Sequence, residues 1–168
     1  MNLNPNHRTM LAVLAVFILD QTTKLLVLSF LGYSRELIVV DGFFKLVHWG
    51  NTGAAWSLFR DQNELLTIVS LVALLILFLG RRYFDVKSPL GPIAMGMVFG
   101  GVIGNILDRV LRGHVVDFLY FYIQRRSGSE IGFPAFNIAD SAICVGIGML
   151  FILSLESEES STSQAGTA

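Results

Sequence analysis

The chain has 168 residues, with 12 Lys and Arg against 13 Asp and Glu, a formal net charge of −1 and 53% hydrophobic residues. Charged residues make up only 15%, against about 25% in an ordinary soluble domain, so polar surface is too scarce to cover a compact water-soluble particle. The near-neutral charge argues against nucleic-acid binding. The 13 Phe exclude disorder over most of the chain, and the single Cys excludes an internal disulfide framework and a cysteine-rich zinc site. This composition indicates a small integral membrane protein.

The first apolar run covers residues 9–19 and continues through Asp20 and Lys24 to residue 31. Its basic start is weak and no small-x-small cleavage site follows cleanly, so we expect a retained transmembrane helix and not a removed signal peptide. Asp20 and Lys24 are four residues apart and share a helical face, where they can form an ion pair. We interpret them as a structural pair, because each charge has a local partner.

The long connection after this helix, residues 32–64, contains two β-type runs around a turn. Residues 37–40 and 43–49 flank Asp41-Gly42, a dipeptide typical of a hairpin between such runs. The sequence therefore predicts a small β-hairpin beside the helices.

Three further apolar runs, residues 65–80, 88–107 and 141–155, approach the roughly 20 residues that cross the hydrocarbon core. The last run extends backwards through residues 133–140. Together with the first run they predict an all-α membrane protein of four transmembrane helices.

Three glycines of the third helix, Gly96, Gly100 and Gly104, are spaced four apart and lie on one face. Small residues at this spacing let another helix approach closely. We expect helix–helix packing on that face and not a substrate groove.

Four crossings place both long connections, residues 32–64 and 108–132, on one side of the membrane and both termini on the other. The basic link at residues 81–87 favours a cytoplasmic position for the termini, and so an external position for the long connections. Residues 156–168 are acidic and rich in Ser and Thr, which is typical of a disordered tail. We therefore expect one membrane domain at residues 1–155, followed by this tail.

Charged residues stand where the third and fourth helices meet the interface, and an unpaired carboxylate is costly there. Asp117 lies in the apolar stretch of residues 115–119, with no basic residue adjacent in sequence. Asn137 and Asp140 are three apart and share a helical face; the helix dipole would explain Asp140 alone but not Asp117. Arg109 either anchors its helix at the interface, as arginines often do, or holds a lipid phosphate or a substrate carbonyl.

Topology allows Asp117 and Asp140 to meet at one interface. Two carboxyls in contact cannot both ionise easily, so one keeps a proton while the other stays a base. Such a pair can activate water, attack an amide carbonyl and protonate the leaving nitrogen. We therefore predict peptide-bond hydrolysis, with pKa values that belong to the pair and not to either acid.

Other chemistries are less well supported. A metal site made from Asp117, Asp140 and His114 lacks a tight ligand spacing, and we expect no metal or cofactor. A serine nucleophile, Ser57 or Ser141, would need His48 or His114 folded against it, without triad spacing to support it. Cys144 is expected to be buried and inert in the last helix.

Two functions of other classes compete with hydrolysis. Carboxylates in membranes also serve as proton relays, which would suit a small proton-coupled transporter or channel. Transporters usually contain internal repeats, and this chain shows none. The other competitor is a non-catalytic scaffold in which the aspartates only cap helices.

Five segments, in order and on a four-helix hydropathy frame, resemble the lipoprotein signal peptidases, also called signal peptidase II. Each segment alone is a modest signal, but the five together are highly specific and span about residues 10–155. They are Asp20-Gln21-x-x-Lys24, Asn51-Thr52-Gly53-Ala54-Ala55, Gly104-Asn105-x-x-Asp108-Arg109, Gly113-His114-Val115-Val116-Asp117-Phe118 and Phe133-Pro134-Ala135-Phe136-Asn137-Ile138-Ala139-Asp140-Ser141.

The resemblance implies an intramembrane aspartic endopeptidase of the bacterial cytoplasmic membrane that needs no cofactor. Such enzymes remove the signal peptide from a prolipoprotein by cleaving before a diacylglyceryl-modified cysteine. By motif position, the catalytic aspartates would be Asp117 and Asp140. The supporting or substrate-binding residues would be Asp20, Lys24, Asn51, Gly53, Asn105, Asp108, Arg109 and Asn137.

The family resemblance also implies four transmembrane helices with a small β cradle on the extracytoplasmic face. Both termini would be cytoplasmic, the active site would lie near the extracytoplasmic face, and membrane phospholipid would surround it. Cyclic peptide antibiotics such as globomycin would bind at the active site. The chain departs from the family in having Trp56 where phenylalanine is common, and an acidic tail where a basic one is frequent.

Overall fold

The computed structural model describes residues 4–53, 61–81, 88–125 and 129–165, without the side chains of residues 157–165. Its helices are α1 (Pro5–Phe30), α2 (Asn63–Gly80), α3 (Gly91–Arg112) and α4 (Ile138–Ala165). Each is long and apolar enough to cross a membrane, the candidate span of α4 ending at Glu156. The expectation of four helices of transmembrane length is confirmed. Most of the basic link, residues 82–87, and the motif residues Ala54, Ala55, Trp56 and Ser57 lie outside the described residues.

Local sequence explains where α1 begins and where α3 ends. Asn4 caps α1, because its side-chain oxygen accepts a hydrogen bond from the backbone N–H of Asn6 at 3.0 Å. Gly113 ends α3 with a φ of +75°, a left-handed conformation that glycine adopts without strain, and its N–H donates to the Arg109 carbonyl at 3.1 Å. The chain thereby turns from α3 directly into the strand that carries Asp117.

Helix α4 continues beyond its apolar part into the acidic segment. The sequence predicts disorder from residue 156 onward, whereas the backbone is helical to Ala165. Between Met149 and Ala165 there is no glycine or proline to end the helix, which is consistent with this extension. The division into a membrane domain and a tail stays a prediction.

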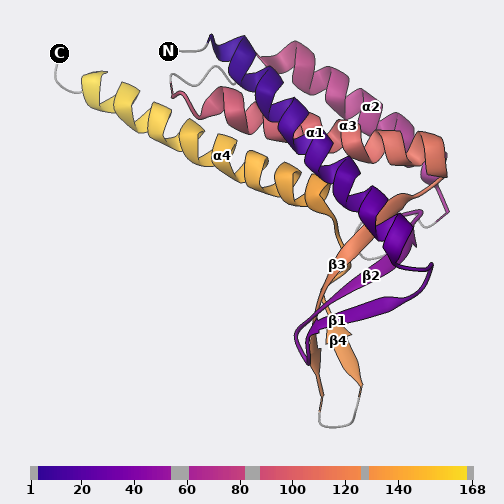
Figure 1. Ribbon diagram of the computed structural model, residues 1–168. Helices are drawn as coiled ribbons and strands as arrows, with labels where there is room; N and C mark the ends of the chain where they lie inside the picture. The colour runs from indigo at the N-terminus through magenta and orange to yellow at the C-terminus, as the bar shows by residue number, and fades with distance from the viewer. Residues whose placement is uncertain (1–3, 54–60, 82–87, 126–128, 166–168) are drawn as a thin grey trace.

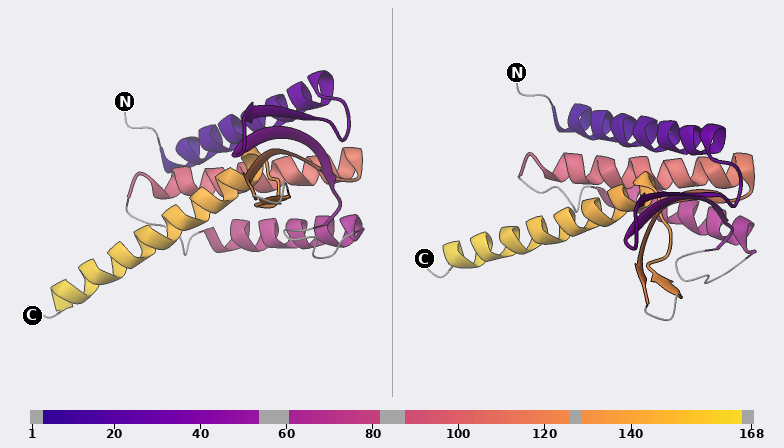
Figure 2. Two further views of the ribbon diagram at one scale, coloured as in Figure 1. Left: turned by 90° about the horizontal axis from the view of Figure 1, so that it is seen from below. Right: turned by 60° about the horizontal axis from the view of Figure 1, so that its bottom comes forward.

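Helix α3 is the centre of the bundle, with α1 and α2 on either side of it and α4 crossing it at an angle (Figure 2). The predicted glycine face packs against α1: an added Cβ on Gly96 would lie 2.5 Å from the Thr9 carbonyl oxygen, and one on Gly100 would lie 2.8 Å from that of Val13. The expectation of helix packing on this face is confirmed.

A second close approach joins α3 to α4. A Cβ on Gly101 would lie 2.5 Å from the carbonyl oxygen of Ala139, and one on Gly146 of α4 would lie 2.8 Å from that of Ala94. Beside these contacts the core of the bundle is formed by Ala94, Met95, Val98, Phe99 and Leu150. The first turn of α4 is therefore held tightly against α3.

A four-stranded antiparallel sheet in the order β1-β2-β3-β4 completes the fold. Its strands are β1 (Glu36–Val40), β2 (Phe44–Asn51), β3 (Val115–Gln124) and β4 (Glu130–Gly132). The predicted hairpin is confirmed, with Gly42 at a φ of +73° in the turn between β1 and β2. The sequence analysis did not predict β4.

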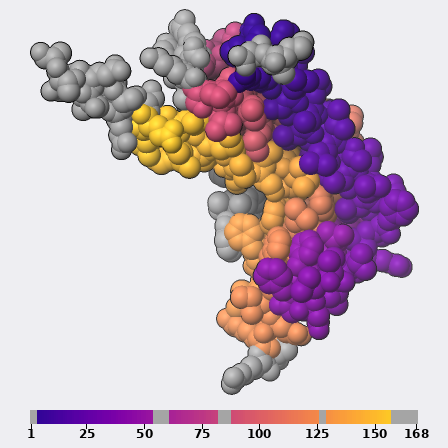
Figure 3. Space-filling view, turned by 60° about the vertical axis from the view of Figure 1, so that its left-hand side comes forward, coloured from indigo at the N-terminus to yellow at the C-terminus, as the bar shows by residue number. Residues whose placement is uncertain are grey.

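The sheet lies at one end of the bundle and both termini lie at the other (Figure 1). Val116 and Phe118 of β3 pack with Val27 of α1 and fix the sheet to the helices. In the space-filling view, the surface of β1 and β2 continues directly from the end of α1 (Figure 3). The described parts of both long connections therefore lie at the same end of the bundle, as the four crossings predict.

Candidate active site

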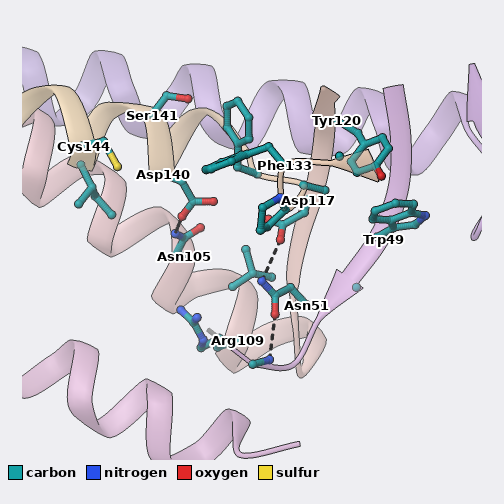
Figure 4. A pocket seen from close by; sticks show the side chains of 18 residues that line it. Trp49, Asn51, Asn105, Arg109, Asp117, Tyr120, Phe133, Asp140, Ser141 and Cys144 are labelled. Carbon is teal, nitrogen blue, oxygen red and sulfur yellow. Dashed lines mark hydrogen bonds between the residues drawn. The ribbon is translucent and has the colours of Figure 1, made fainter. Parts of the chain in front are cut away.

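A cavity of about 850 Å³ opens where the sheet meets the helices. Its walls come from β2, β3, the end of α3, the start of α4 and the segment that joins β4 to α4. Asp117 and Asp140 both line it, from β3 and α4 respectively (Figure 4). The structure therefore brings together the two acids that the sequence predicts to meet.

Asp117 is almost completely buried, with 3% of its surface exposed. Its Oδ2 accepts a hydrogen bond from Asn51 Nδ2 and its Oδ1 accepts one from Asn137 Nδ2, each at 2.9 Å. Burial raises the pKa of Asp117 to about 7, and the negative charge of Asp140 acts in the same direction, against the two amides. Asp117 is therefore a carboxyl that can keep or release a proton near neutral pH.

Asp140 is the third residue of α4 and forms a capping box with Asn137. The Asp140 N–H donates to Asn137 Oδ1 at 2.9 Å, and the Asn137 N–H donates to Asp140 Oδ2 at 3.2 Å. The remaining carboxyl oxygen, Oδ1, accepts a hydrogen bond from Asn105 Nδ2 at 2.8 Å. Asn137 thus contacts both acids, one through its side chain and the other through its backbone.

A buried ion cluster supports the site from behind. Lys24 Nζ lies 2.9 Å from Asp20 Oδ2 and 2.8 Å from Asp108 Oδ2, and none of the three side chains is exposed. The same Nζ donates to Asn105 Oδ1 at 3.0 Å, and Arg112 forms an ion pair with Asp108. The predicted pairing of Asp20 with Lys24 is confirmed, but the sequence analysis missed its extension to Asp108 and Arg112.

The cluster also holds the backbone segments that carry the two acids. Asp20 Oδ1 accepts a hydrogen bond from the Ala139 N–H at 3.0 Å, beside Asp140. Asp108 Oδ2 accepts one from the Val116 N–H at 3.2 Å, beside Asp117. Each buried carboxylate of the cluster is therefore bonded to the neighbour of one cavity acid.

The other predicted residues lie at the cavity wall. The Gly53 N–H donates to Asn51 Oδ1 at 2.9 Å, which leaves the Asn51 amide nitrogen directed at Asp117. Arg109 lines the cavity, and among the described residues its buried Nε has no hydrogen-bond partner. The sequence analysis did not single out Trp49 and Tyr120, whose apolar rings cannot be distinguished in the sequence from ordinary strand residues.

The alternative sites find little support in the geometry. Ser141 Oγ donates to the Asn137 carbonyl at 2.9 Å, while His48 Nδ1 lies 2.8 Å from the Leu31 carbonyl oxygen. Within the described ranges, no group of three or more His, Cys, Asp and Glu residues is arranged to hold a metal ion. Cys144 is exposed and lines the cavity, so the expectation that it is buried was wrong; one turn after Asp140, it faces the same opening.

Comparison with known proteins gives the family. A family model described as signal peptidase (SPase) II matches residues 12–156. The chain belongs to the signal peptidase II family. This membership implies a protease.

Named relatives agree with the signal peptidase II assignment, and a solved bacterial membrane enzyme has a similar fold. A lipoprotein signal peptidase of Symbiobacterium thermophilum is 38% identical over 142 residues, which are 84% of this chain and 90% of the relative. A lipoprotein signal peptidase of Neisseria gonorrhoeae is 42% identical over 139 residues, 79% of this chain and 80% of the relative. A solved bacterial membrane enzyme, determined by the in meso method at 2.3 Å resolution, has a TM-score of 0.68 and 31% identity, covering 91% of this chain and 90% of its own.

Proposed function

We propose that the chain is an intramembrane aspartic endopeptidase in which Asp117 and Asp140 act as one catalytic pair. The observation that carries the proposal is the double contact of Asn137, whose side-chain amide donates to Asp117 and whose backbone N–H donates to Asp140 at one cavity. Membership of a signal peptidase family supplies the class of reaction. A scaffold that only caps helices would not need Asp117 buried beside a second acid.

The reaction requires one proton shared by the pair, and the raised pKa of Asp117 supports that state near neutral pH. The ionised carboxyl takes a proton from water as the water oxygen bonds to the carbonyl carbon of the scissile amide, and the protonated carboxyl gives its proton to the carbonyl oxygen. In the second step one carboxyl takes a hydroxyl proton back, the other protonates the nitrogen, and the C–N bond breaks. The pair ends with the single proton with which it began.

The neighbouring residues have supporting roles in this proposal. Asn51, Asn105 and Asn137 hold the carboxyls in position, and Gly53 fixes the amide of Asn51. Asp20, Lys24 and Asp108 stabilise the surrounding backbone. Arg109, whose Nε has no hydrogen-bond partner in the described part of the chain, binds a carbonyl oxygen of the substrate or a phosphate of the surrounding phospholipid.

The proposed substrate is a prolipoprotein, cleaved before its diacylglyceryl-modified cysteine. The names of the relatives support a lipoprotein substrate, and a cavity at the end of a helical bundle suits a scissile bond near the membrane interface. We assign the chain to the bacterial cytoplasmic membrane, with both termini cytoplasmic and the cavity near the extracytoplasmic face. The support is the basic sequence of residues 81–87, which joins the end of α2 to the start of α3; both of these helix ends lie at the end of the bundle that carries the termini (Figure 1). A cyclic peptide such as globomycin would compete for this cavity.

Substitution of each acid tests the proposal. Asp117→Asn and Asp140→Asn keep the side-chain size but remove the titrating group, so we expect cleavage of a diacylglyceryl-modified precursor to fall by about 10²-fold to 10⁴-fold in each variant. Asp41→Asn, in the exposed hairpin turn, is the matched control and should cleave normally. Full activity of both variants, once membrane insertion is verified, would exclude the pair.

Two further measurements test the remaining parts of the proposal. A reporter fused after Ser160 should be cytoplasmic, and an external signal would reverse the orientation. Purified protein in liposomes should carry no proton flux in the absence of peptide; a flux lost in Asp117→Asn would favour the transporter function.

A further inference from the structure

A lysine is buried in the sheet although the proposed chemistry does not use it. Lys45 of β2 has 3% of its surface exposed. Its Nζ lies 2.8 Å from Glu36 Oε2 of β1 and 2.8 Å from Glu130 Oε2 of β4. Burial alone would lower the pKa of Lys45, but the hydrogen bonds to Glu130 and Glu36 outweigh it and hold the pKa above its ordinary value. Lys45 is therefore a permanent cation between two strands that are not neighbours.

Two aromatic rings of β3 complete the surroundings of this cation. Lys45 Nζ lies 4.7 Å from the ring centroid of Tyr122 and 5.5 Å from that of Tyr120, within the range of cation–π attraction. Tyr120 stands directly opposite Lys45 in the β2–β3 ladder. Lys45, Tyr120, Tyr122, Glu36 and Glu130 form a cluster, the lysine clamp, with at least one member from every strand.

The lysine clamp is continuous with one wall of the cavity. Tyr120 lines the cavity beside Trp49, with 4.9 Å between the ring centroids. Gly132, two residues after Glu130, also lines the cavity, and an added Cβ there would overlap the Tyr120 ring. Figure 4 shows Trp49 and Tyr120 together on the side of the cavity away from Asp140.

We propose that Lys45 is a positioning residue for substrate binding, which holds Tyr120 and β4 in place as the cavity wall remote from Asp140. The inference rests on the proposed function, since it concerns the substrate of that site. Without the cation, Glu36 and Glu130 have no shared partner, and β4 has only three residues with which to hold its place by backbone pairing. The carboxyls of the catalytic pair are held by asparagines outside the clamp, so the loss affects binding more than chemistry.

Lys45→Met keeps an unbranched chain of similar length but removes the charge and the hydrogen-bond donors of the ammonium group. We expect KM for a diacylglyceryl-modified precursor peptide to rise about tenfold, equivalent to about 1.4 kcal/mol, with kcat within about twofold of the wild type. Glu130→Gln removes the negative charge of a partner whose side chain is 37% exposed, so this variant should still fold; we expect its KM to rise about threefold. Lys45→Arg can still pair with both carboxylates, so its KM should lie closer to the wild-type value than that of Lys45→Met.

Arg125→Met is the matched control, because it removes an exposed cation directly after β3 and should leave both constants unchanged. A KM equal to the wild-type value in both Lys45→Met and Glu130→Gln would overturn the proposal. A fall in kcat with unchanged KM would overturn it as well, because that result belongs to a residue of the chemistry.

Binding without turnover separates this proposal from the catalytic one. In an Asp140→Asn background the precursor peptide should bind about tenfold more weakly when Lys45→Met is added. Binding can be followed by the fluorescence of Trp49 in a variant that also carries Trp56→Phe, which removes the only other tryptophan; we expect the Trp49 emission to shift as the peptide binds. Unchanged affinity would contradict the role of Lys45. Continued cleavage by Asp140→Asn would instead contradict the catalytic pair, so the two failures are distinguishable.

Discussion

Removal of the Lys24 charge should destabilise the protein strongly, because it leaves two buried carboxylates without their common cation. Asp20, Lys24 and Asp108 are fully buried, and Lys24 Nζ lies within 2.9 Å of both carboxylates. In Lys24→Met, Asp108 keeps its pair with Arg112, but Asp20 has no other cation among its described contacts. Loss of one partner from a buried pair costs about 3–5 kcal/mol.

This cost can be compared with the stability available. A total free energy of unfolding of about 5–15 kcal/mol is typical, and about 1 kcal/mol corresponds to roughly 2–4 °C in Tm for a chain of this size. We therefore expect the Tm of Lys24→Met in detergent micelles to fall by about 6–20 °C. Thermal unfolding followed by circular dichroism measures this shift directly.

A double substitution decides whether the uncompensated charge is the cause. Asp20→Asn removes the negative charge but keeps the oxygen that accepts from the Ala139 N–H. We expect Lys24→Met with Asp20→Asn to recover at least half of the lost Tm, since removal of both charges of a buried pair is often nearly neutral. A Tm loss below about 3 °C in the single variant, or no recovery in the double variant, would refute this reasoning.

Three other predictions concern the site. Asn51→Ala removes a hydrogen bond that favours the ionised form of Asp117 and so lowers its pKa. We expect the alkaline limb of the wild-type kcat/KM profile near the Asp117 pKa of about 7, and in Asn51→Ala it should move to higher pH; a shift to lower pH would contradict this assignment. Asn137→Ala removes a charge-assisted hydrogen bond worth about 1.5–3 kcal/mol, so kcat should fall about 10-fold to 100-fold, and unchanged kcat would mean that Asn137 does not hold the pair. Gly101→Ala forces apart α3 and α4 and should cost about 1–3 kcal/mol in thermal unfolding, whereas Gly148→Ala, with open space around its added Cβ, should be neutral; equal losses would argue against the close approach.

Local spacing was sufficient to predict several parts of the molecule. The four apolar runs, the Asp41-Gly42 turn and the pairing of Asp20 with Lys24 each depend on residues within one element or one hairpin. The meeting of Asp117 and Asp140 depends on topology, because four crossings bring the end of α3 and the start of α4 to one side. The apolar runs, the hairpin and the ion pair follow from the periodicity of helices and strands and from the thickness of the membrane.

The parts that were missed depend on which elements lie next to each other. Nothing in the local sequence distinguishes Lys45 from an ordinary surface lysine, because its partner Glu130 is 85 positions away. Asp108 likewise gains Lys24 as a partner only because α1 packs against α3. The three-residue strand β4 is too short to show the alternation of apolar and polar residues that predicts a strand. It is defined by its pairing with β3, which the sequence alone does not reveal.

The double contact of Asn137 has a consequence for how the bundle can vary. Because one residue bonds to both acids, their separation follows from the internal dimensions of a single asparagine and the first turn of α4. Adjustments in the tilt of α2, none of whose residues is buried, therefore leave that separation unchanged. Helix α2 is thus free to adapt to bilayers of different thickness while the acids keep their spacing.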